Sequence, residues 1–570
     1  MAQEPKREPI SDKKRLQKRL SSLQTERSGW MSVWQELSDH IQPFSGRFST
    51  DQRNRATRNF NNIIDDAATG SLEILAAGLM SGLTSPARPW FRLGVPESTG
   101  LRDDHAVKSW LADCQRVLLG VFAKSNTYHA LHFVYKQLGL FGTACSVVMD
   151  DYDTVLHHYP VPVGEFLLAS DFRGNVNTVY REFDKTVEEL VGEFGYSNCS
   201  VNVRNLYDQN ALDRWHTIFH SIEPRKSRDP MRADAKNMAF RSTYFEKGGN
   251  DELLLRDGGM TKFRALCPRW DKEGGDVYGT SPAMRALGAV KQLQHEQIRK
   301  ANGIDQMTKP AVQVPMSMRN SEVDMLPGGV TFVDMAGPNS AIRNLMDVRI
   351  NLEHLGLDIQ EVRQRIRAAF YTDLFLLITN STDTQKTATE IAERHEEKML
   401  VLGPVLERLQ SELLAPLIEI GFDRCAEIGL LPEPPEVLAG MPLEIEYISV
   451  LAQAQRMIAT NGIDRFVGAI GAVAAFKPAV LDKFNEDKWA DTYAELLGVD
   501  PDIVRSDEDV AAIRQARAQA EQQARMAEAV NMAADSAAKL GNVNLDQNTA
   551  ASSVIEQLSG YGAPTAEASA

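Results

Sequence analysis

The sequence predicts an α+β protein in which α-helices predominate. Apolar residues recur every three or four positions over long stretches of the chain, which is typical of amphipathic helices. Between residues 145 and 267 the spacing changes to alternation of apolar and polar residues, which is typical of strands. The segment 507–540 consists largely of Ala, Gln, Arg and Glu and predicts one further long helix.

Composition limits the class of partner. The chain has 570 residues, enough for several domains, and 43% hydrophobic with 24% charged residues is ordinary for a folded soluble protein. Its net charge of -15 should repel nucleic acid and acidic membranes from the molecule as a whole. A tight DNA binder is therefore not expected. A conduit for DNA is not excluded, because DNA slides more easily past a surface that does not hold its phosphates.

The five cysteines are scattered, and none are spaced for a CxxC metal site or a short disulfide framework. We expect buried or reduced thiols in a cytoplasmic protein. The first twenty residues are charged throughout, so no secretory signal is expected there. The cysteines are Cys114, Cys145, Cys199, Cys267 and Cys425.

The first predicted helix covers Ser11–Ile41, where apolar side chains follow helical spacing. Its first turns are strongly basic. They form either a solvated face or a docking surface for an acidic neighbour, and the pattern alone leaves both interpretations open. The basic residues are Lys13, Lys14, Arg15, Lys18 and Arg19.

The stretch LAAGLMSGLTSPARPWFRL at residues 75–93 is apolar and rich in small residues. Gly78 and Gly82 have the GxxxG spacing that lets membrane helices approach closely. A membrane-spanning helix needs about 20 apolar residues, and Glu73 and Pro86 limit this run to roughly half of that. We therefore predict a closely packed helix of the folded protein, from about residue 63 to 83.

Further elements are predicted from periodicity. Two helices are expected at His105–Ser125 and Tyr128–Phe141. Strands are expected in CSVVMDDYDTVLHHYPV, GEFLLASD and VNTVYREF, followed by a short helix at Thr186–Phe194. A meander is expected in AFRSTYFE, DELLLRD and TKFRALC, with a turn at Gly258 and Gly259.

A helix, a small β unit and a second helix follow as an excursion from the main body. The first helix is expected at Pro282–Ala301, with proline at its favoured first turn. Two strands joined by a loop containing Pro327-Gly328-Gly329 come next, and a helix returns at Asn351–Ala369. The return helix carries Arg363, Arg365 and Arg367 among carboxylates, so we expect charged pairing between neighbouring copies rather than a phosphate grip.

The C-terminal third is expected to be mainly helical. Thr387 and Glu390 form a capping box that starts a long helix, in which Pro404 and Pro416 should cause kinks. The segment LEIEYIS should form a short strand. The last helix has an alanine seam, which offers too little apolar area to stabilise the helix alone, so it should need other helices packed closely against it. Gly541 is expected to cap its C-terminus.

Motifs for catalysis are scarce. The sequence contains no P-loop, no GxGxxG after a strand, no GxSxG elbow and no HExxH. Asp150, Asp151 and Asp153, with His157 and His158 nearby, could hold Mg²⁺ in a nuclease, or could simply lie in a solvated turn. The polar segment ITNSTDTQK at residues 378–386 is either a linker or a finger that touches a ligand.

Five segments together resemble the portal proteins, or head-to-tail connectors, of short-tailed phages. They occur in the expected order within residues 63–418. The segments are LAAGLMSGLTSPARPWFRL, SNTYHALHFVYKQLGLFGTA, GEFLLASDFRGNVNTVYREF, VYGTSPAMRALGAVKQL and TATEIAERHEEKMLVLGPVLERLQSELLAPLI.

The resemblance implies the portal fold, with wing, stem, clip and crown, assembled as a ring that is usually a dodecamer. It implies these divisions: residues 1–280 wing, 281–303 and 351–369 stem helices, 304–350 clip, 370–386 tunnel loop region, 387–430 kinked wing helix, 431–500 connection, 501–541 crown, and 542–570 flexible tail or barrel. Thr384, Gln385 and Lys386 become candidates for contact with DNA in the channel. Gly78, Gly82 and the three arginines of the return helix become candidates for subunit packing.

The implied function is passage of double-stranded DNA into and out of the capsid, with no catalysis, cofactor, metal or membrane. Implied partners are further copies of the chain, terminase, major capsid and scaffolding proteins, and a tail adaptor. The implied location is the portal vertex of the virion, and the host cytoplasm during assembly. Two alternatives remain at this point: another virion ring or tail adaptor without a genome channel, and a metal-dependent nuclease.

Overall fold

The structure is a computed structural model of the whole chain. The residues that it describes are 12–48, 61–96, 104–232, 234–248, 253–308, 312–313, 343–344, 352–379, 402–438, 444–448, 466–474, 476–497, 505 and 507–541. The chain divides into two compact units, Met1–Gly498 and Val499–Ala570, which we call the body and the C-terminal unit. Helices and antiparallel sheets are both present, as the α+β prediction requires.

Four helices build the main core of the body. The C-terminal half of α1, all of α2 and much of α4 bury apolar side chains in one cluster, with Trp34 and Trp90 fully enclosed. Gly139 of α4 lets α2 approach closely, because a Cβ there would lie 2.8 Å from the side chain of Leu72. The helices are α1 Asp12–Ile41, α2 Ala67–Leu83, α3 His105–Lys124 and α4 Thr127–Phe141.

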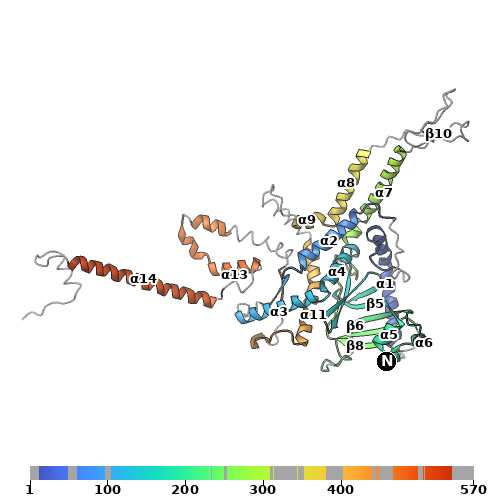
Figure 1. Cartoon of the computed structure of the whole chain (residues 1–570), viewed down its shortest axis with the longest axis horizontal. Coiled ribbons are helices and arrows are strands. Elements are labelled where there is room, and N and C mark those ends of the chain that lie inside the picture. Colours follow the sequence, from blue (N-terminus) through green and yellow to red (C-terminus); the bar gives the residue numbers. More distant parts are fainter. Residues whose placement is uncertain are drawn as a thin grey trace, which may run out of the picture. The chain divides into compact units, whose positions relative to one another are not determined.

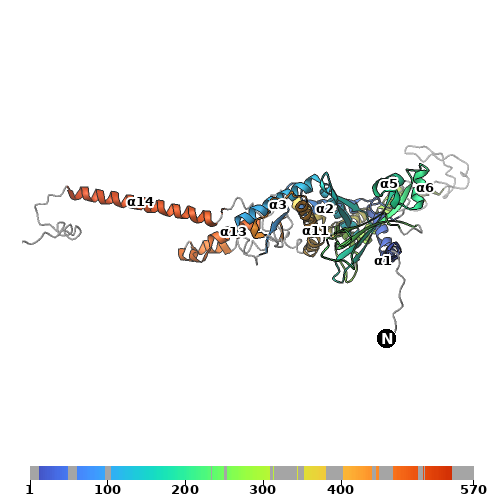
Figure 2. The same cartoon turned by 90° about the horizontal axis from the view of Figure 1, so that it is seen from below.

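Two antiparallel sheets follow the helices. The larger has the order β4-β5-β6-β7-β8, and the smaller has the order β3-β2-β9. Side chains alternate across the larger sheet, so Phe219 packs under α1 while Ile218 packs under α5 and α6. Figure 2 shows α1 and the α5–α6 pair on opposite sides of this sheet.

The bounds of these strands and helices are β2 Cys145–Asp151, β3 Val155–Val161, β4 Phe166–Ser170, β5 Val176–Thr186, α5 Val187–Phe194, α6 Val201–Asp208, β6 Trp215–Pro224, β7 Phe240–Glu246, β8 Arg256–Met260 and β9 Ala265–Leu266.

A pair of short strands joins distant parts of the chain. β1, Phe91–Gly94, is antiparallel to β12, Glu444–Tyr447, with Phe91 opposite Tyr447. β12 lies in the segment LEIEYIS, so the prediction of a strand there is confirmed. The body is therefore closed by a segment that comes roughly 350 residues after its partner.

Two long helices, α7 and α8, leave the body side by side (Figure 1). α7 spans Pro282–Thr308 and α8 spans Leu352–Ala369, which confirms both helices predicted for the excursion. Between them the structure describes one short antiparallel pair, β10 Val312–Gln313 with β11 Arg343–Asn344. α9, Thr372–Thr379, follows α8 at once and occupies part of the range expected as loop.

A further helix covers residues 402–427 and contains a π-helical segment, Gln410–Leu414. Within that segment the backbone N–H of Ala415 bonds to the carbonyl of Gln410. Pro404 and Pro416 both lie inside this helix, so the prediction that they do not end it is confirmed. The irregular turn comes directly before Pro416, which has no N–H to donate. Thr387 and Glu390 lie outside the described residues.

The rest of the body contains short helices, including η6 Glu436–Leu438, η7 Pro478–Lys483 and α13 Glu486–Leu497. In the C-terminal unit the structure describes one long helix, α14, Asp507–Gly541. Among the α14 residues whose side chains are described, none is buried. The predicted final helix is confirmed in length and position.

Three predictions of local structure were wrong or incomplete. Gly258 and Gly259 lie inside β8 rather than in a turn, and a Cβ at Gly259 would come within 2.1 Å of the carbonyl oxygen of Ala235. Glycine therefore serves a close backbone approach there. The segment DELLLRD is strand only from Arg256 onwards, and α6 and β6 were not predicted.

Candidate functional site

The base of the α7–α8 pair is the first feature of the candidate site. Ser281 caps α7, since its hydroxyl accepts the N–H of Met284 at 3.0 Å and donates to the carbonyl of Leu140 at 2.8 Å. Pro282 follows at the first helical position, as predicted. α7 is thereby fixed to the end of α4.

Asp65 connects α7, α8 and the start of α2. Its side chain is 2% exposed and accepts hydrogen bonds from Arg363 Nη2 at 2.7 Å and from Gln297 Nε2 at 2.7 Å. Gln294 accepts the backbone N–H groups of Ile64 and Asp65. Burial opposes ionisation, but the hydrogen bonds from Arg363, the Ala67 N–H and Gln297 hold the pKa of Asp65 below its usual value.

The Asp65 joint was not predicted. The residues that meet there are separated by more than 200 positions in the chain, which no local periodicity can reveal. One signal was present, because two aspartates stand directly before the apolar run of α2 and acidic residues are favoured at helix starts. The Oδ1 of Asp65 accepts the N–H of Ala67 at 3.0 Å.

The three arginines of α8 have different surroundings. Arg363 pairs with Asp65, and Arg365 donates to Gln292 of α7 at 3.1 Å, both within one chain. Arg367 is exposed. Pairing of these arginines between neighbouring copies stays a prediction, with Arg367 in the best position for it.

Gly78 and Gly82 serve packing inside the chain. A Cβ at Gly78 would lie 2.3 Å from the ring of Phe375, so α9 rests directly on α2 at this glycine. Gly82 is buried. Subunit packing by either glycine stays a prediction, while Gly78 permits a close approach of α9 to α2 within one chain.

The junction between α8 and α9 bends sharply at Tyr371. This residue has φ +55°, a conformation that costs energy for a residue with a side chain. Its neighbours Phe370, Leu374 and Phe375 are buried and hold the bend in place. α9 is thereby directed across α2 instead of continuing α8.

The channel candidates Thr384, Gln385 and Lys386 lie outside the described residues. The described chain stops at Thr379 and resumes at residue 402.

The aspartates of the nuclease hypothesis are not arranged around a common point. Asp150 pairs with Arg264 and lies 3.4 Å from Arg424, while Asp151 accepts the backbone N–H and the hydroxyl of Thr154 in the β2–β3 turn. Across the described parts of the chain, no group of three or more His, Cys, Asp or Glu side chains could hold a metal ion. The geometry favours the interpretation of a hydrogen-bonded turn.

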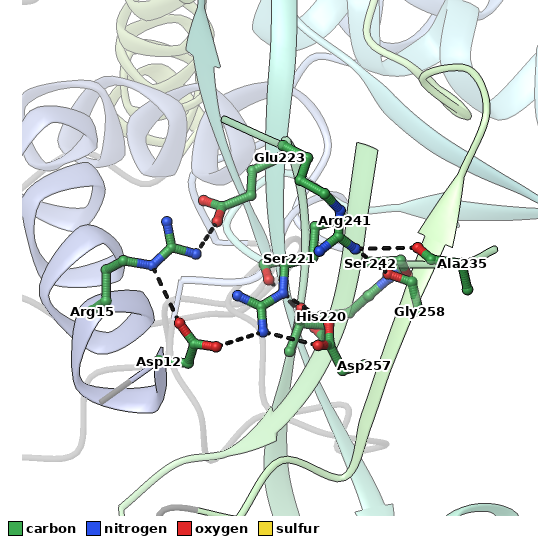
Figure 3. Close-up of polar contacts among 12 residues, drawn as sticks. Asp12, Arg15, His220, Ser221, Glu223, Ala235, Arg241, Ser242, Asp257 and Gly258 are labelled. Atoms are coloured by element: carbon green, nitrogen blue, oxygen red, sulfur yellow. Dashed lines mark hydrogen bonds and ion pairs between the residues drawn. The ribbon is translucent and has the colours of Figure 1, made fainter. Parts of the chain in front are cut away.

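The basic first turns of α1 are partly neutralised by the sheet. Figure 3 shows Arg15 directed at Glu223, and Arg241 between Asp12 and Asp257. The hydrogen bond from Arg241 holds the pKa of Asp12 below its usual value, although burial acts in the opposite direction. Lys14, Lys18 and Arg19 are exposed, so the two interpretations of this basic face both survive for them.

All five cysteines are buried free thiols, as predicted. The sulfurs of Cys145, in β2, and Cys267, directly after β9, lie 3.7 Å apart, which the scattered sequence positions did not reveal. None of the helices described is long and apolar enough to cross a membrane.

Comparison with known proteins gives a consistent result. Residues 13–504 match the family described as bacteriophage head to tail connecting protein. The chain is 52% identical over 553 residues to a probable portal protein of Bordetella phage BPP-1, covering 97% of this chain and 99% of that protein. It is 43% identical over 530 residues to a portal protein of Salmonella phage epsilon15, covering 93% and 95%. A solved structure titled "Neck of empty GTA particle computed with C6 symmetry" is 11% identical with a TM-score of 0.36, and the match covers 76% of this chain and 90% of that one. This similarity is too weak to support an argument about fold or function.

Proposed function

The chain belongs to the family of bacteriophage head-to-tail connecting proteins and has portal function, and we propose that its copies form a ring at one capsid vertex around a channel for double-stranded DNA. Packaging and later ejection of the genome would pass through this ring. A dodecamer is the expected assembly. The chain is expected to have no catalysis of its own, with terminase supplying the motor.

The observation that carries this proposal is the α7–α8 pair. Both helices leave the body together as one projection, and Ser281 and Asp65 fix them at their base (Figure 1). We assign them as the stem, residues 304–350 between them as the clip, and the α+β body before residue 281 as the wing. A tail adaptor without a genome channel would not require such a projection.

α14 supports the ring in a second way. α14 has 35 residues and a mostly alanine seam, which gives a lone helix little apolar area for packing, and none of its described side chains is buried. Small side chains permit close contact with the same helix of neighbouring copies. We therefore assign residues 501–541 as the crown.

Oligomeric state is the first test of the ring. Native mass spectrometry of the purified protein should show a complex of about twelve or thirteen copies, as expected for a closed cyclic ring. Negative-stain images should show a central hole. A stable monomer or dimer at micromolar concentration would contradict the proposal that the chain forms the ring without a partner protein.

Channel contact is a separate part of the proposal. Thr384, Gln385 and Lys386 are assigned to DNA-backbone contact, with Lys386 supplying the charge. Particles assembled with Lys386→Ala should package DNA at a different rate from wild type, whereas Lys386→Arg should behave as wild type. Equal rates for all three would remove Lys386 from the channel.

Terminase, the major capsid and scaffolding proteins and a tail adaptor are the expected partners, and the virion is the expected site of function. Pull-down of terminase by the assembled ring, compared with the unassembled chain, tests the motor contact. The nuclease alternative predicts Mg²⁺-dependent plasmid cleavage that Asp151→Ala abolishes, and intact plasmid would dispose of it.

A further inference from the structure

We propose that Arg269, Trp270 and Asp271 are positioning residues that couple the paired helices α7 and α8 to the two helices flanking the predicted channel segment. We call these three residues the coupling tripeptide. The proposal deepens the proposed function, since its consequence for DNA rests on the assignment of residues 384–386 to the channel. The coupling itself is a property of described residues.

The backbone of the coupling tripeptide is fixed on the body. Trp270 donates its N–H to the carbonyl of Gly142 at 2.9 Å, and the carbonyl of Asp271 accepts the N–H of Thr280 at 2.8 Å. Glycines permit this approach, because a Cβ at Gly142 would lie 2.3 Å from the carbonyl oxygen of Gly279. The coupling tripeptide therefore cannot shift without moving the end of α4 and the start of α7.

Arg269 fastens the helix of residues 402–427. Its Nη2 meets one carboxylate oxygen of Glu412 at 2.5 Å, and its Nε and backbone N–H meet the other at 3.1 and 3.0 Å. The Arg269 side chain is 2% exposed and that of Glu412 19%, so the guanidinium makes this charge-assisted contact largely shielded from solvent. Glu412 lies in the π-helical segment, which places the irregular turn at the point of attachment.

Asp271 links two helices through one carboxylate. Its Oδ2 accepts Arg285 of α7 at 2.8 Å, while its Oδ1 lies 3.3 Å from Arg408 of the 402–427 helix. Arg408 also donates to the carbonyl of Trp270 at 3.1 Å. The first turns of α7 and the first turns of the 402–427 helix therefore share one anchor.

Trp270 reaches the end of α8. Its fully buried indole lies 6.1 Å from the ring of Tyr371, centroid to centroid, at an interplanar angle of 35°. Tyr371 is the residue with positive φ at which the chain turns from α8 into α9. The strained bend thus rests on the middle residue of the coupling tripeptide.

These contacts bring both flanks of one segment to one place. α9 ends at Thr379 and the next described helix begins at residue 402, so residues 384–386 lie in the chain between two helices that are both tied to the coupling tripeptide. A tilt of α7 relative to the body would displace Arg285, and would pull on the Asp271 carboxylate that Arg285 and Arg408 share, while the Asp271 backbone stays fixed. The geometry points to transmission of stem movement to the flanks of the channel segment.

The test compares two arginines of the same helix. Arg408→Gln removes the contacts to Trp270 and Asp271, whereas Arg424→Gln removes pairing with Asp150 and Glu427 at the far end of the helix. The two side chains are similarly covered, 26% and 18% exposed, so general damage should be comparable. The readout is amide hydrogen exchange of Thr372–Thr379 in the full-length protein. The contacts of Arg408 are with Trp270 and Asp271 and not with this helix.

Coupling predicts that Arg408→Gln speeds exchange in α9 by about tenfold, the effect of losing charge-assisted hydrogen bonds on a local opening, while Arg424→Gln leaves α9 unchanged. Equal exchange in α9 for both variants would overturn the proposal. If Arg408→Gln fails to fold, Arg285→Gln removes the other ion pair of Asp271. The Arg285 side chain is 55% exposed, so this variant should fold, and the same exchange measurement applies.

Function is measured separately, as the amount of DNA in particles assembled with each variant. Rings that form normally but package several-fold less DNA with Arg408→Gln than with Arg424→Gln are expected. Equal packaging by intact rings would refute the consequence for DNA. Failure of the wild-type chain to form rings or package DNA would instead refute the proposed function and leave the exchange result standing.

Discussion

α2 and α14 are both helices rich in small residues, yet they are held in opposite ways. α2 buries Leu72, Leu75 and Leu79 completely against α4 and α9 of its own chain. α14 is twice as long, about 52 Å at the usual rise per residue, and exposes nearly every side chain that is described. Small residues allow close approach in both helices, but only in α2 do leucines among them supply apolar area within the chain.

The difference teaches where each helix must find its stability. α2 is complete in one chain, since Gly78 receives Phe375 and Gly139 receives Leu72. None of the described side chains of α14 is buried, and its seam is mostly alanine. Its stability in a ring would therefore depend on protein concentration, whereas that of α2 would not.

Lowering the pH should give the largest difference in stability between the body and the C-terminal unit. Burial, with repulsion from His157, lowers the pKa of His158 to about 4. Burial also lowers the pKa of His220. The unfolded chain binds these protons near pH 6.5 and the folded body does not, so stability present above pH 6.5 is lost as the pH falls towards 4. For His158 the loss is about 3 kcal/mol.

Tryptophan fluorescence can follow the body alone, because residues 499–570 contain neither tryptophan nor histidine. The midpoint of thermal unfolding by fluorescence should fall between pH 6.5 and 5, and His158→Leu should reduce that slope. An unchanged slope in the variant would contradict the assignment to His158.

The Asp65 joint gives the next largest effect. Arg363→Ala leaves the buried Asp65 carboxylate without its cation and should lower the free energy of unfolding of the body by about 2 kcal/mol. Arg367→Ala, on the same helix but exposed, should change it by less than about 0.5 kcal/mol. Urea unfolding followed by fluorescence measures both. If Arg367→Ala instead prevents ring formation at unchanged stability, pairing between copies is supported.

Two glycines of α2 form a matched pair for a smaller effect. Gly78→Ala places a methyl group against Phe375 and should cost about 1 to 2 kcal/mol by overpacking. At Gly70 a Cβ meets nothing within 4 Å, so Gly70→Ala should stabilise by about 0.5 to 1 kcal/mol through helix propensity. Opposite shifts of the unfolding midpoint are expected, and shifts of the same sign would contradict the packing of α9 on α2.

The smallest expected effect on the body comes from breaking α14. Ala524→Pro should disrupt this helix at a cost of about 3 kcal/mol within α14 itself. The fluorescence midpoint of the body should not move, because α14 belongs to the other compact unit. Circular dichroism should record the lost helix. A lowered body midpoint would show that the C-terminal unit stabilises the body after all.

Sequence reasoning located the elements with strong periodicity well. α1, α3, α4 and the α7–α8 pair end within a few residues of their predicted bounds, except that α7 continues to Thr308. α2 begins at Ala67 instead of residue 63, because Ile64 and Asp65 are held by Gln294 outside the helix. A distant partner, not local propensity, sets that boundary.

The candidate site was less accessible to prediction. The family resemblance pointed to residues 384–386, which the structure does not describe. For Asp65 the sequence indicated only the start of a helix and not its distant partners, and the pairing of Arg269 with Glu412 had no sequence signal. Arg269 and Glu412 are 143 positions apart, and nothing in the spacing of either indicates the other. Buried ion pairs between distant elements are properties of the fold, and periodicity reports only on one element at a time.

The pairing of β1 with β12 has a consequence for the timing of synthesis. When β1 leaves the ribosome, its partner lies roughly 350 residues further along the message. At about 5 to 20 residues per second, the delay is about 20 to 70 seconds. During that interval one edge of the body, with Phe91 and Leu93 in it, remains open to pairing with other strands. A nascent chain therefore cannot present a finished body until translation has passed Tyr447.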